Sequence, residues 1–173
     1  MIRPLAAALV LTALSAGGAA AQSLSVDMDQ FRGRWFEVLR SPNDVQRDCR
    51  RSQIDFTARD RADRYSLVVR CTRRADGEVE LLRANARVTD PGVNTRFRFT
   101  LTGLLSFGGL AGQNYRVVDR AADYSWAILA LPDGSDWWAW HRSQTPPAST
   151  RIQLIARARA AGLDTRQVVH TGR

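Results

Sequence analysis

A glycine and a tryptophan near the start of an alternating segment constrain the fold most strongly. The triplet Gly33-Arg34-Trp35 opens a run of short segments in which apolar and polar residues alternate. Glycine lets another group approach the backbone closely, and an indole that follows it on a strand can close one end of a small antiparallel barrel. The triplet alone is weak evidence, because glycine-x-tryptophan occurs by chance in many proteins. Its meaning depends on the segments that follow.

Those segments have the period of β-strands. Apolar residues recur at every second position, the spacing of a strand with one buried face. Asp76-Gly77 predicts a hairpin turn, and Asp90-Pro91-Gly92 ends the segment after it. The sequence predicts eight strands, at residues 35–40, 52–58, 65–72, 78–88, 96–101, 114–118, 125–131 and 137–142.

The period changes only after Pro146-Pro147. Residues 148–161 predict an amphipathic helix, with Ser149 or Thr150 as its cap and Gly162 as its end. Residues at helical spacing within this segment are Ile152, Ile155, Ala156 and Arg159. Together these elements predict an all-β fold, an eight-stranded antiparallel up-and-down barrel with one C-terminal α-helix packed on its wall.

The first residues predict a secretory signal peptide at residues 1–21. Arg3 supplies a positive start, residues 5–14 are apolar, and alanines at 19–21 precede Gln22 at a cleavage site. The apolar run is too short for a membrane span, and no cysteine near the cleavage site could accept a lipid. We therefore expect a soluble periplasmic or secreted protein whose residues 22–173 form one domain.

Two cysteines, Cys49 and Cys71, flank a predicted strand pair. In an oxidising compartment a disulfide between them would close a loop of about twenty residues and contribute roughly 3 kcal/mol. A reactive thiol or a metal site is the alternative. The only histidines, His141 and His170, lie far away in sequence, which weakens that alternative.

The chain carries an excess of positive charge. Its basic side chains are all arginine, and the formal net charge is +8. One interpretation is a compositional bias on a solvated surface; the other is attraction to anionic partners such as membrane lipid headgroups. Nucleic-acid binding is disfavoured, because the arginines alternate with carboxylates and form no stripe.

Three ordered motifs resemble one family. They are Gly33-Arg34-Trp35-Phe36-Glu37, the stretch from Tyr115 through Asp123-Tyr124, and the stretch from Trp138 to Arg142 followed by Thr145-Pro146. The chain resembles the lipocalins over about residues 28–169, and within them the bacterial outer-membrane-type group. Residues 106–109 resemble a loop of that group. The chain departs from it by lacking a lipidated cysteine, by two extra residues before Pro146, and by its cysteine pair.

The resemblance implies roles for particular residues. Trp35 would point into the barrel floor beside Gly33, and Arg142 would lie across the indole in a cation–π contact of roughly 1–2 kcal/mol. Asp123 and Tyr124 would form a turn signature between two strands.

Alternation from these inward markers predicts the residues that line the interior. They are Tyr65, Leu67, Val69, Phe97, Phe99, Leu101, Tyr115, Val117, Trp126, Ile128, Trp138 and Trp140. An aromatic interior can be a packed core or a ligand cavity. The lipocalin resemblance favours a cavity, because Ala84, Ala86 and Ala130 would leave room between the rings.

The expected mouth of the barrel carries charged residues. Glu37 shares the inward face of Trp35, and Arg47, Arg50 and Arg51 precede a strand. Glu37 could contact a ligand, and the three arginines could contact a carboxylate or phosphate headgroup. A structural ion pair for Glu37 and simple solvation for the arginines are the alternatives. The glycine-rich residues 103–112 could form a lid or only a long connection.

The sequence shows little that points to catalysis. We find no histidine cluster with metal spacing, no phosphate-binding glycine loop and no nucleophile elbow. We therefore expect no enzyme, cofactor or metal, and a monomer or weak homodimer. The predicted function is reversible binding and transport of a small hydrophobic ligand, a fatty acid or lysophospholipid. A carrier for a pigment or other planar hydrophobe is one alternative, and a lipocalin-fold enzyme is another.

Overall fold

The computed structural model describes residues 24–102 and 112–172. The predicted signal peptide and the motif at residues 106–109 lie outside the described residues. The barrel strands are β1 Gly33–Arg40, β2 Cys49–Ala58, β3 Arg64–Arg73, β4 Val79–Val88, β5 Arg96–Leu101, β6 Gln113–Arg120, β7 Trp126–Ala130 and β8 Trp137–His141. Two helices, α1 Met28–Phe31 and α2 Ala148–Ala160, and a short strand, β9 Val169–His170, complete the described elements.

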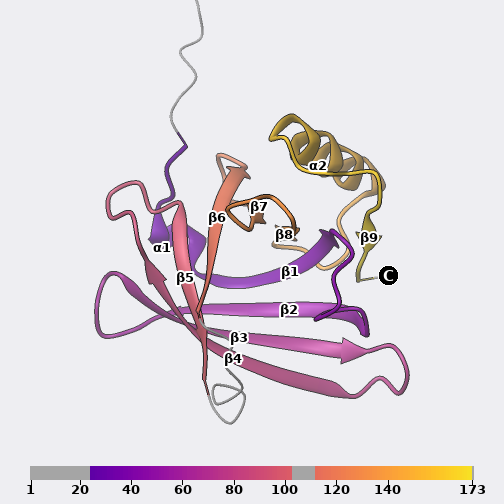
Figure 1. Ribbon diagram of the computed structural model, residues 1–173, viewed down its shortest axis with the longest axis horizontal. Helices are drawn as coiled ribbons and strands as arrows, with labels where there is room; N and C mark the ends of the chain where they lie inside the picture. The colour runs from indigo at the N-terminus through magenta and orange to yellow at the C-terminus, as the bar shows by residue number, and fades with distance from the viewer. Residues whose placement is uncertain (1–23, 103–111, 173) are drawn as a thin grey trace, which may run out of the picture.

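The strands form a closed antiparallel barrel. Consecutive strands from β2 to β8 are hydrogen-bonded neighbours, and β1 closes the ring by pairing with both β8 and β2. The predicted eight-stranded barrel with a C-terminal helix is therefore confirmed. Figure 1 shows α2 outside the ring of strands.

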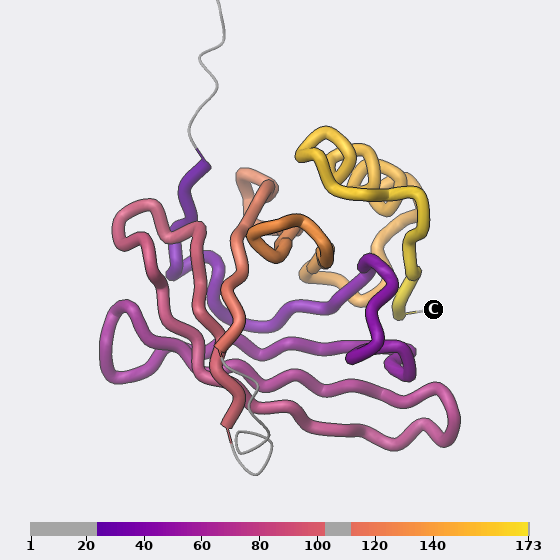
Figure 2. Tube along the Cα trace, viewed as in Figure 1, coloured from indigo at the N-terminus to yellow at the C-terminus, as the bar shows by residue number. Residues whose placement is uncertain are grey.

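Strand β1 changes partner along its length. Its first part, from Gly33 to Glu37, pairs with β2, and its last residues, Leu39 and Arg40, pair with β9. Figure 2 shows the yellow C-terminal segment beside the end of β1. A bulge between Glu37 and Leu39 shifts the register against β8. Because a bulge reverses the alternation that follows it, Arg40 comes onto the side of Glu37.

The hydrophobic residues form two clusters on opposite sides of the wall. The interior cluster includes Trp35, Phe56 and Phe97, which are at most 1% exposed. The outer cluster joins β7 and β8 to Leu154 and Ala158 of α2. The barrel wall beneath α2 is therefore buried on both faces.

The buried face of α2 differs from the predicted one. The helix buries Arg151, Leu154 and Ala158, whereas Ile152 is 69% exposed. Arg151 is buried because its guanidinium donates to the carbonyl oxygens of Val38 and Thr171, which turns this face toward the barrel. The expected cap is also wrong: Pro147 occupies the N-cap position and no side chain caps the helix. Gly162, with φ +81°, follows its end as predicted.

Candidate functional site

The closed end of the barrel is built around Trp35. The Arg142 guanidinium lies 3.6 Å from the centroid of this indole. The Trp35 Nε1–H donates to the carbonyl oxygen of Phe31 at 2.7 Å. The Arg142 guanidinium donates to the carbonyl oxygens of Gln30, Phe31, Arg32, Arg34 and Tyr124. One cation thus satisfies the backbone of several segments and covers the floor.

Gly33 is required by this arrangement. Its φ of +105° lies in the region that favours glycine, and a Cβ there would lie 3.4 Å from Arg142 Nη1. A side chain at this position would therefore strain the backbone and contact the closing cation.

The turn after β6 also belongs to the closed end. Tyr124 adopts φ +56°, and its hydroxyl oxygen accepts a hydrogen bond from the Asp27 amide at 2.7 Å. The Arg120 guanidinium lies 4.4 Å from its ring centroid. Asp123 accepts a hydrogen bond from the Ser125 amide, which holds the turn. These contacts tie the β6–β7 turn to the segment that leads into α1.

Sequence reasoning missed helix α1 and its role as a plug. Asp27 caps the helix, and Phe31 is completely buried in the interior. The Phe31 ring lies 5.3 Å from Trp35 and 5.8 Å from Phe97, measured between centroids. A four-residue helix is too short to show a helical period, so only the aspartate followed by a buried phenylalanine could have indicated it.

Above this floor the interior rings become partly exposed. The centroids of Phe99 and Tyr115 lie 4.5 Å apart, and those of Tyr115 and Trp138 lie 5.4 Å apart. All three side chains are of intermediate exposure, in contrast to the buried Trp35 and Phe97. We call Phe99, Tyr115 and Trp138 the aromatic shelf. Burial raises the pKa of Tyr115 to about 12, so its phenol is neutral at physiological pH.

Ten of the twelve predicted interior residues lie among the interior side chains. The interior cluster and its packed neighbours contain Tyr65, Leu67, Val69, Phe97, Phe99, Leu101, Val117, Trp138 and Trp140. Tyr115 joins them through its contacts with Phe99 and Trp138. The small residues Ala84 and Ala86 also face inward. Whether these residues contact a ligand remains a prediction.

The predicted orientation of β7 is wrong. Trp126, Ile128 and Ala130 belong to the outer cluster beneath α2, and Ala127 and Leu129 face the interior instead. All five residues of β7 are buried, because α2 covers the outer face. With both faces apolar, alternation carries no information about which face is inside.

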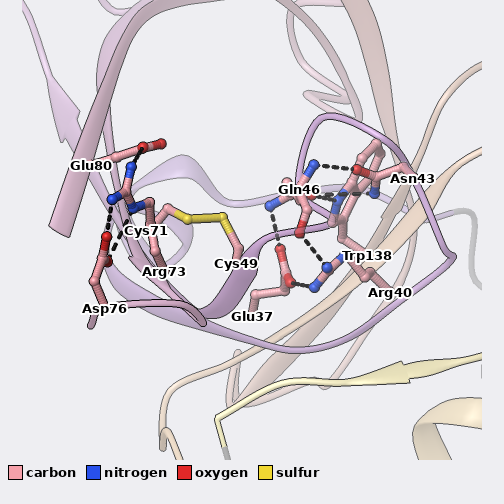
Figure 3. Close-up of a disulfide and its surroundings, with 10 residues drawn as sticks. All are labelled: Glu37, Arg40, Asn43, Gln46, Cys49, Cys71, Arg73, Asp76, Glu80 and Trp138. Atoms are coloured by element: carbon pink, nitrogen blue, oxygen red, sulfur yellow. Dashed lines mark hydrogen bonds and ion pairs between the residues drawn. A yellow bond between two sulfur atoms is a disulfide. The ribbon is translucent and has the colours of Figure 1, made fainter. Parts of the chain in front are cut away.

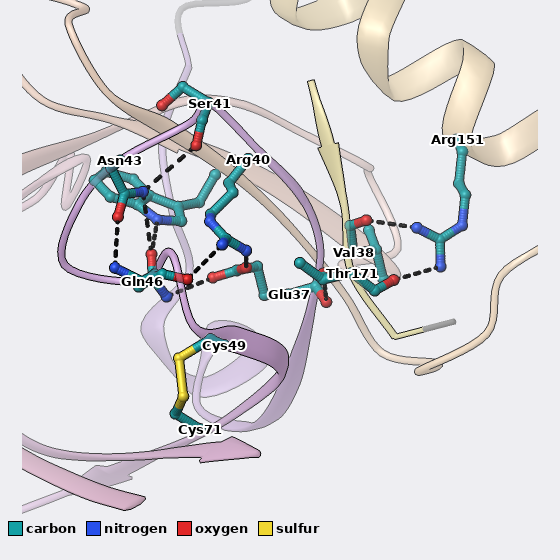
Figure 4. A network of polar contacts seen from close by, with 11 residues as sticks. Glu37, Val38, Arg40, Ser41, Asn43, Gln46, Cys49, Cys71, Arg151 and Thr171 are labelled. Carbon is teal, nitrogen blue, oxygen red and sulfur yellow. Dashed lines mark hydrogen bonds and ion pairs between the residues drawn. A yellow bond between two sulfur atoms is a disulfide. The ribbon is translucent and has the colours of Figure 1, made fainter. Parts of the chain in front are cut away.

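A buried polar network occupies the opposite end of β1 (Figure 4). Arg40 Nη1 donates to Glu37 Oε1 at 3.0 Å, and both side chains are only 1% exposed. Gln46 Nε2, from the β1–β2 loop, donates to Glu37 Oε2 at 2.8 Å. Trp138 Nε1 donates to Gln46 Oε1 at 2.6 Å. The network therefore fastens the loop to the aromatic shelf and to the wall.

Glu37, which we predicted could contact a ligand headgroup, belongs to this network. Burial raises the pKa of Glu37, and Arg40 and Gln46 oppose that rise. The structure thus shows the structural ion pair for Glu37. Arg50 and Arg51 are exposed at the start of β2 and take no part in the network.

The predicted disulfide between Cys49 and Cys71 is confirmed (Figure 3). Its Cα atoms lie 5.4 Å apart, and it links the start of β2 to β3. The Cys49 amide donates to the carbonyl oxygen of Gln46 at 3.0 Å. The disulfide therefore anchors the loop that carries Gln46.

Two depressions lie near the β1–β2 loop and outside the interior cluster. One, of about 360 Å³, is lined by Arg40, Asp44, Arg47 and Arg74 among others. The other, of about 500 Å³, is lined by Ser41, Pro42, Ser135, Asp164, Arg166 and Gln167. Among the described residues, no three His, Cys, Asp or Glu side chains gather as a metal site. Within the same residues, no helix has the length and apolar character to cross a membrane.

Comparisons with known proteins agree with this geometry. Residues 26–173 match the model of the lipocalin-like domain. Apocrustacyanin C2 superposes with a TM-score of 0.63 and 14% identity, covering 84% of this chain and 78% of its own. Lobster apocrustacyanin A1 has a TM-score of 0.62 and 14% identity, covering 83% and 77%. The siderocalin Ex-FABP, described as having dual ligand specificities, has a TM-score of 0.57 and 12% identity, covering 82% and 93%. No curated protein sequence matches this chain.

Proposed function

Because the chain belongs to the lipocalin family, we propose that it reversibly binds and carries a small hydrophobic ligand in the open half of its barrel. One observation carries the proposal: the interior is completely buried at the Trp35 end and partly exposed at the aromatic shelf. Partly exposed apolar side chains on a concave inner face gain free energy when a ligand covers them. The protein acts as a carrier and not as an enzyme.

The proposed ligand is an acyl lipid, a fatty acid or lysophospholipid. Each buried methylene contributes about 0.8 kcal/mol, so a long chain binds tightly without a covalent bond. Leu101 and Val69 are half-buried, pack against the interior cluster and offer aliphatic contacts. The exposed Arg50 and Arg51 supply positive charge near the start of β2 for an anionic headgroup.

A planar hydrophobe such as a pigment is the second candidate. The three rings of the shelf follow one another at centroid distances of 4.5 and 5.4 Å and are tilted by 32° and 52°, so a flat ligand would stack on one ring and meet the edges of the others. Colour that co-purifies with the protein would favour this candidate over an acyl lipid.

The proposed place of action is the periplasm or the outside of the cell, after removal of residues 1–21. The disulfide supports export, because such bonds persist in oxidising compartments. Kinship with the bacterial outer-membrane-type lipocalins, and peripheral contact with membrane lipids, remain predictions from the motifs and the net charge of +8.

Two variants of β5 test the proposal. Phe99 points to the interior, whereas its neighbour Thr100 is exposed on the outer face. Phe99→Ala should weaken binding of a fatty acid by about tenfold, because it removes apolar contact worth 1–2 kcal/mol. Thr100→Ala should bind as the wild type does. Tryptophan fluorescence titration measures both, and equal affinity of the two variants would place the ligand elsewhere.

A further inference from the structure

The depression of about 360 Å³ beside the β1–β2 loop gathers three arginines from separate segments. Arg40 lies at the end of β1, Arg47 on the loop, and Arg74 just after β3. Asp44 and Asn43 also line it, and Val169 of β9 forms one side. No ring of the aromatic shelf lines this depression, so it is separate from the proposed acyl site.

The charges of this depression are incompletely balanced. Elsewhere on the surface, arginines such as Arg34 and Arg166 lie within 3.0 Å of a carboxylate. Within the described chain, neither Arg47 nor Arg74 has a carboxylate oxygen within 4.0 Å of its guanidinium. Asp44 offsets one of these two charges. The depression therefore keeps a net positive charge.

Arg40 adds a buried donor to the same wall. Its Nη1 donates to Glu37 and its Nη2 donates to the carbonyl oxygen of Gln46, whereas its Nε has no hydrogen-bond partner among the described residues. The side chain is 1% exposed, so this donor is shielded from bulk water. A buried donor without a partner costs free energy, which a nearby acceptor would recover.

The arginines are held on a stiff frame. The Arg74 amide donates to the carbonyl oxygen of Asp48 at 2.8 Å, which joins the β3–β4 connection to the loop. Gln46 accepts the Cys49 amide and donates its own amide to Asn43 Oδ1 at 2.9 Å. The disulfide at Cys49 lies beside these contacts (Figure 3). A ligand would thus meet backbone already in place, which lowers the cost of binding.

We propose that this depression binds a phosphate group, carried by a soluble phosphate ester or by a phospholipid headgroup. Guanidinium groups form paired, charge-assisted hydrogen bonds with phosphate oxygens. Arg47 and Arg74 approach from two separate segments with exposed guanidinium groups, which suits a group with several acceptor oxygens. Asp44 weakens the site, so its charge sets the affinity.

Calorimetric titration with glycerol phosphate tests the proposal on the chain from Gln22. Arg47→Gln and Arg74→Gln should each weaken binding by about tenfold, because each removes a charged hydrogen-bond donor. Asp44→Asn should strengthen it by several-fold. Arg61→Gln is the matched control, since Arg61 is exposed in the β2–β3 turn and lies outside this depression.

Sedimentation with vesicles distinguishes the two sources of phosphate. Binding to phosphatidylglycerol vesicles that is lost in Arg47→Gln identifies a lipid headgroup. Binding of glycerol phosphate alone identifies a soluble ester. The proposal is overturned if neither probe binds saturably, or if Arg61→Gln weakens binding as much as Arg47→Gln, because net charge alone would then account for it.

Discussion

The two ends of the barrel are stabilised by different chemistry. At the closed end, Trp35 and Phe31 are completely buried, and Arg142 is satisfied by backbone carbonyls. At the other end, an ion pair between Glu37 and Arg40 and a disulfide fasten a loop, while the inner rings remain partly exposed. The floor is thus a packed core. The other half is held by polar and covalent links, and the rings of its aromatic shelf are half-buried.

The strongest test of this contrast is removal of the floor indole. Trp35→Ala should lower the free energy of unfolding by about 3–5 kcal/mol, because it empties a packed site and removes the ring beneath Arg142. Thermal and urea unfolding measure the loss. Fatty-acid affinity of the folded fraction should change little. A variant with normal melting but lost binding would contradict the assignment of Trp35 to closure.

The disulfide should matter less to the fold and more to the open half. Cys49→Ser with Cys71→Ser opens a loop of 22 residues and should cost about 3 kcal/mol. Because Cys49 adjoins the loop that carries Gln46, hydrogen exchange should rise in residues 41–48 and stay low at Trp35. Uniformly faster exchange in both regions would mean that the two ends are not independent.

Substitutions at two glycines with positive φ allow a direct comparison of the closed end with an open turn. Gly33 has φ +105° and Gly77 has φ +76°, but only Gly33 has an atom near the position of an added Cβ, Arg142 Nη1 at 3.4 Å. Gly77→Ala should cost about 1 kcal/mol from backbone strain alone. Gly33→Ala should cost more, because the added Cβ would also contact the Arg142 guanidinium, which backbone carbonyl oxygens hold in place. Equal melting temperatures would show that the Arg142 contact contributes nothing.

The titration of the shelf has no effect at neutral pH and appears only in alkaline solution. Burial raises the pKa of Tyr115 to about 12 in the folded protein, against about 10 in an unfolded chain. The unfolded chain therefore releases this proton first, so stability should hold below pH 10 and fall between about pH 10 and 12. Urea unfolding across this range, with Tyr115→Phe as control, checks the loss. The control should decline less steeply over the same interval.

The strands and their order could be predicted because most of them bury one face. On β5, Phe97 and Phe99 face the interior while Arg96 and Arg98 are exposed, and alternation identifies such a strand directly. On β7 both faces are buried, so the orientation of Trp126 could not be predicted. Alternation therefore gives no orientation for a strand whose outer face is covered by α2.

The candidate site could be predicted only in part for a related reason. Glu37 was placed on the inner face from its distance to Trp35. Its partners, Arg40 and Gln46, were not predicted. A bulge brings Arg40 to the same side of the strand, and Gln46 comes from an irregular loop. Contacts made after a bulge or from a loop have no periodic signature in the sequence.

Native mass spectrometry of the chain from Gln22, purified from its own host, shows whether the barrel carries a ligand. Organic extraction would identify any molecule that co-purifies. We expect one acyl lipid per chain, bound at the aromatic shelf. An empty protein whose tryptophans are not quenched by added fatty acid would contradict it, and would mean that the aromatic shelf is part of a packed core.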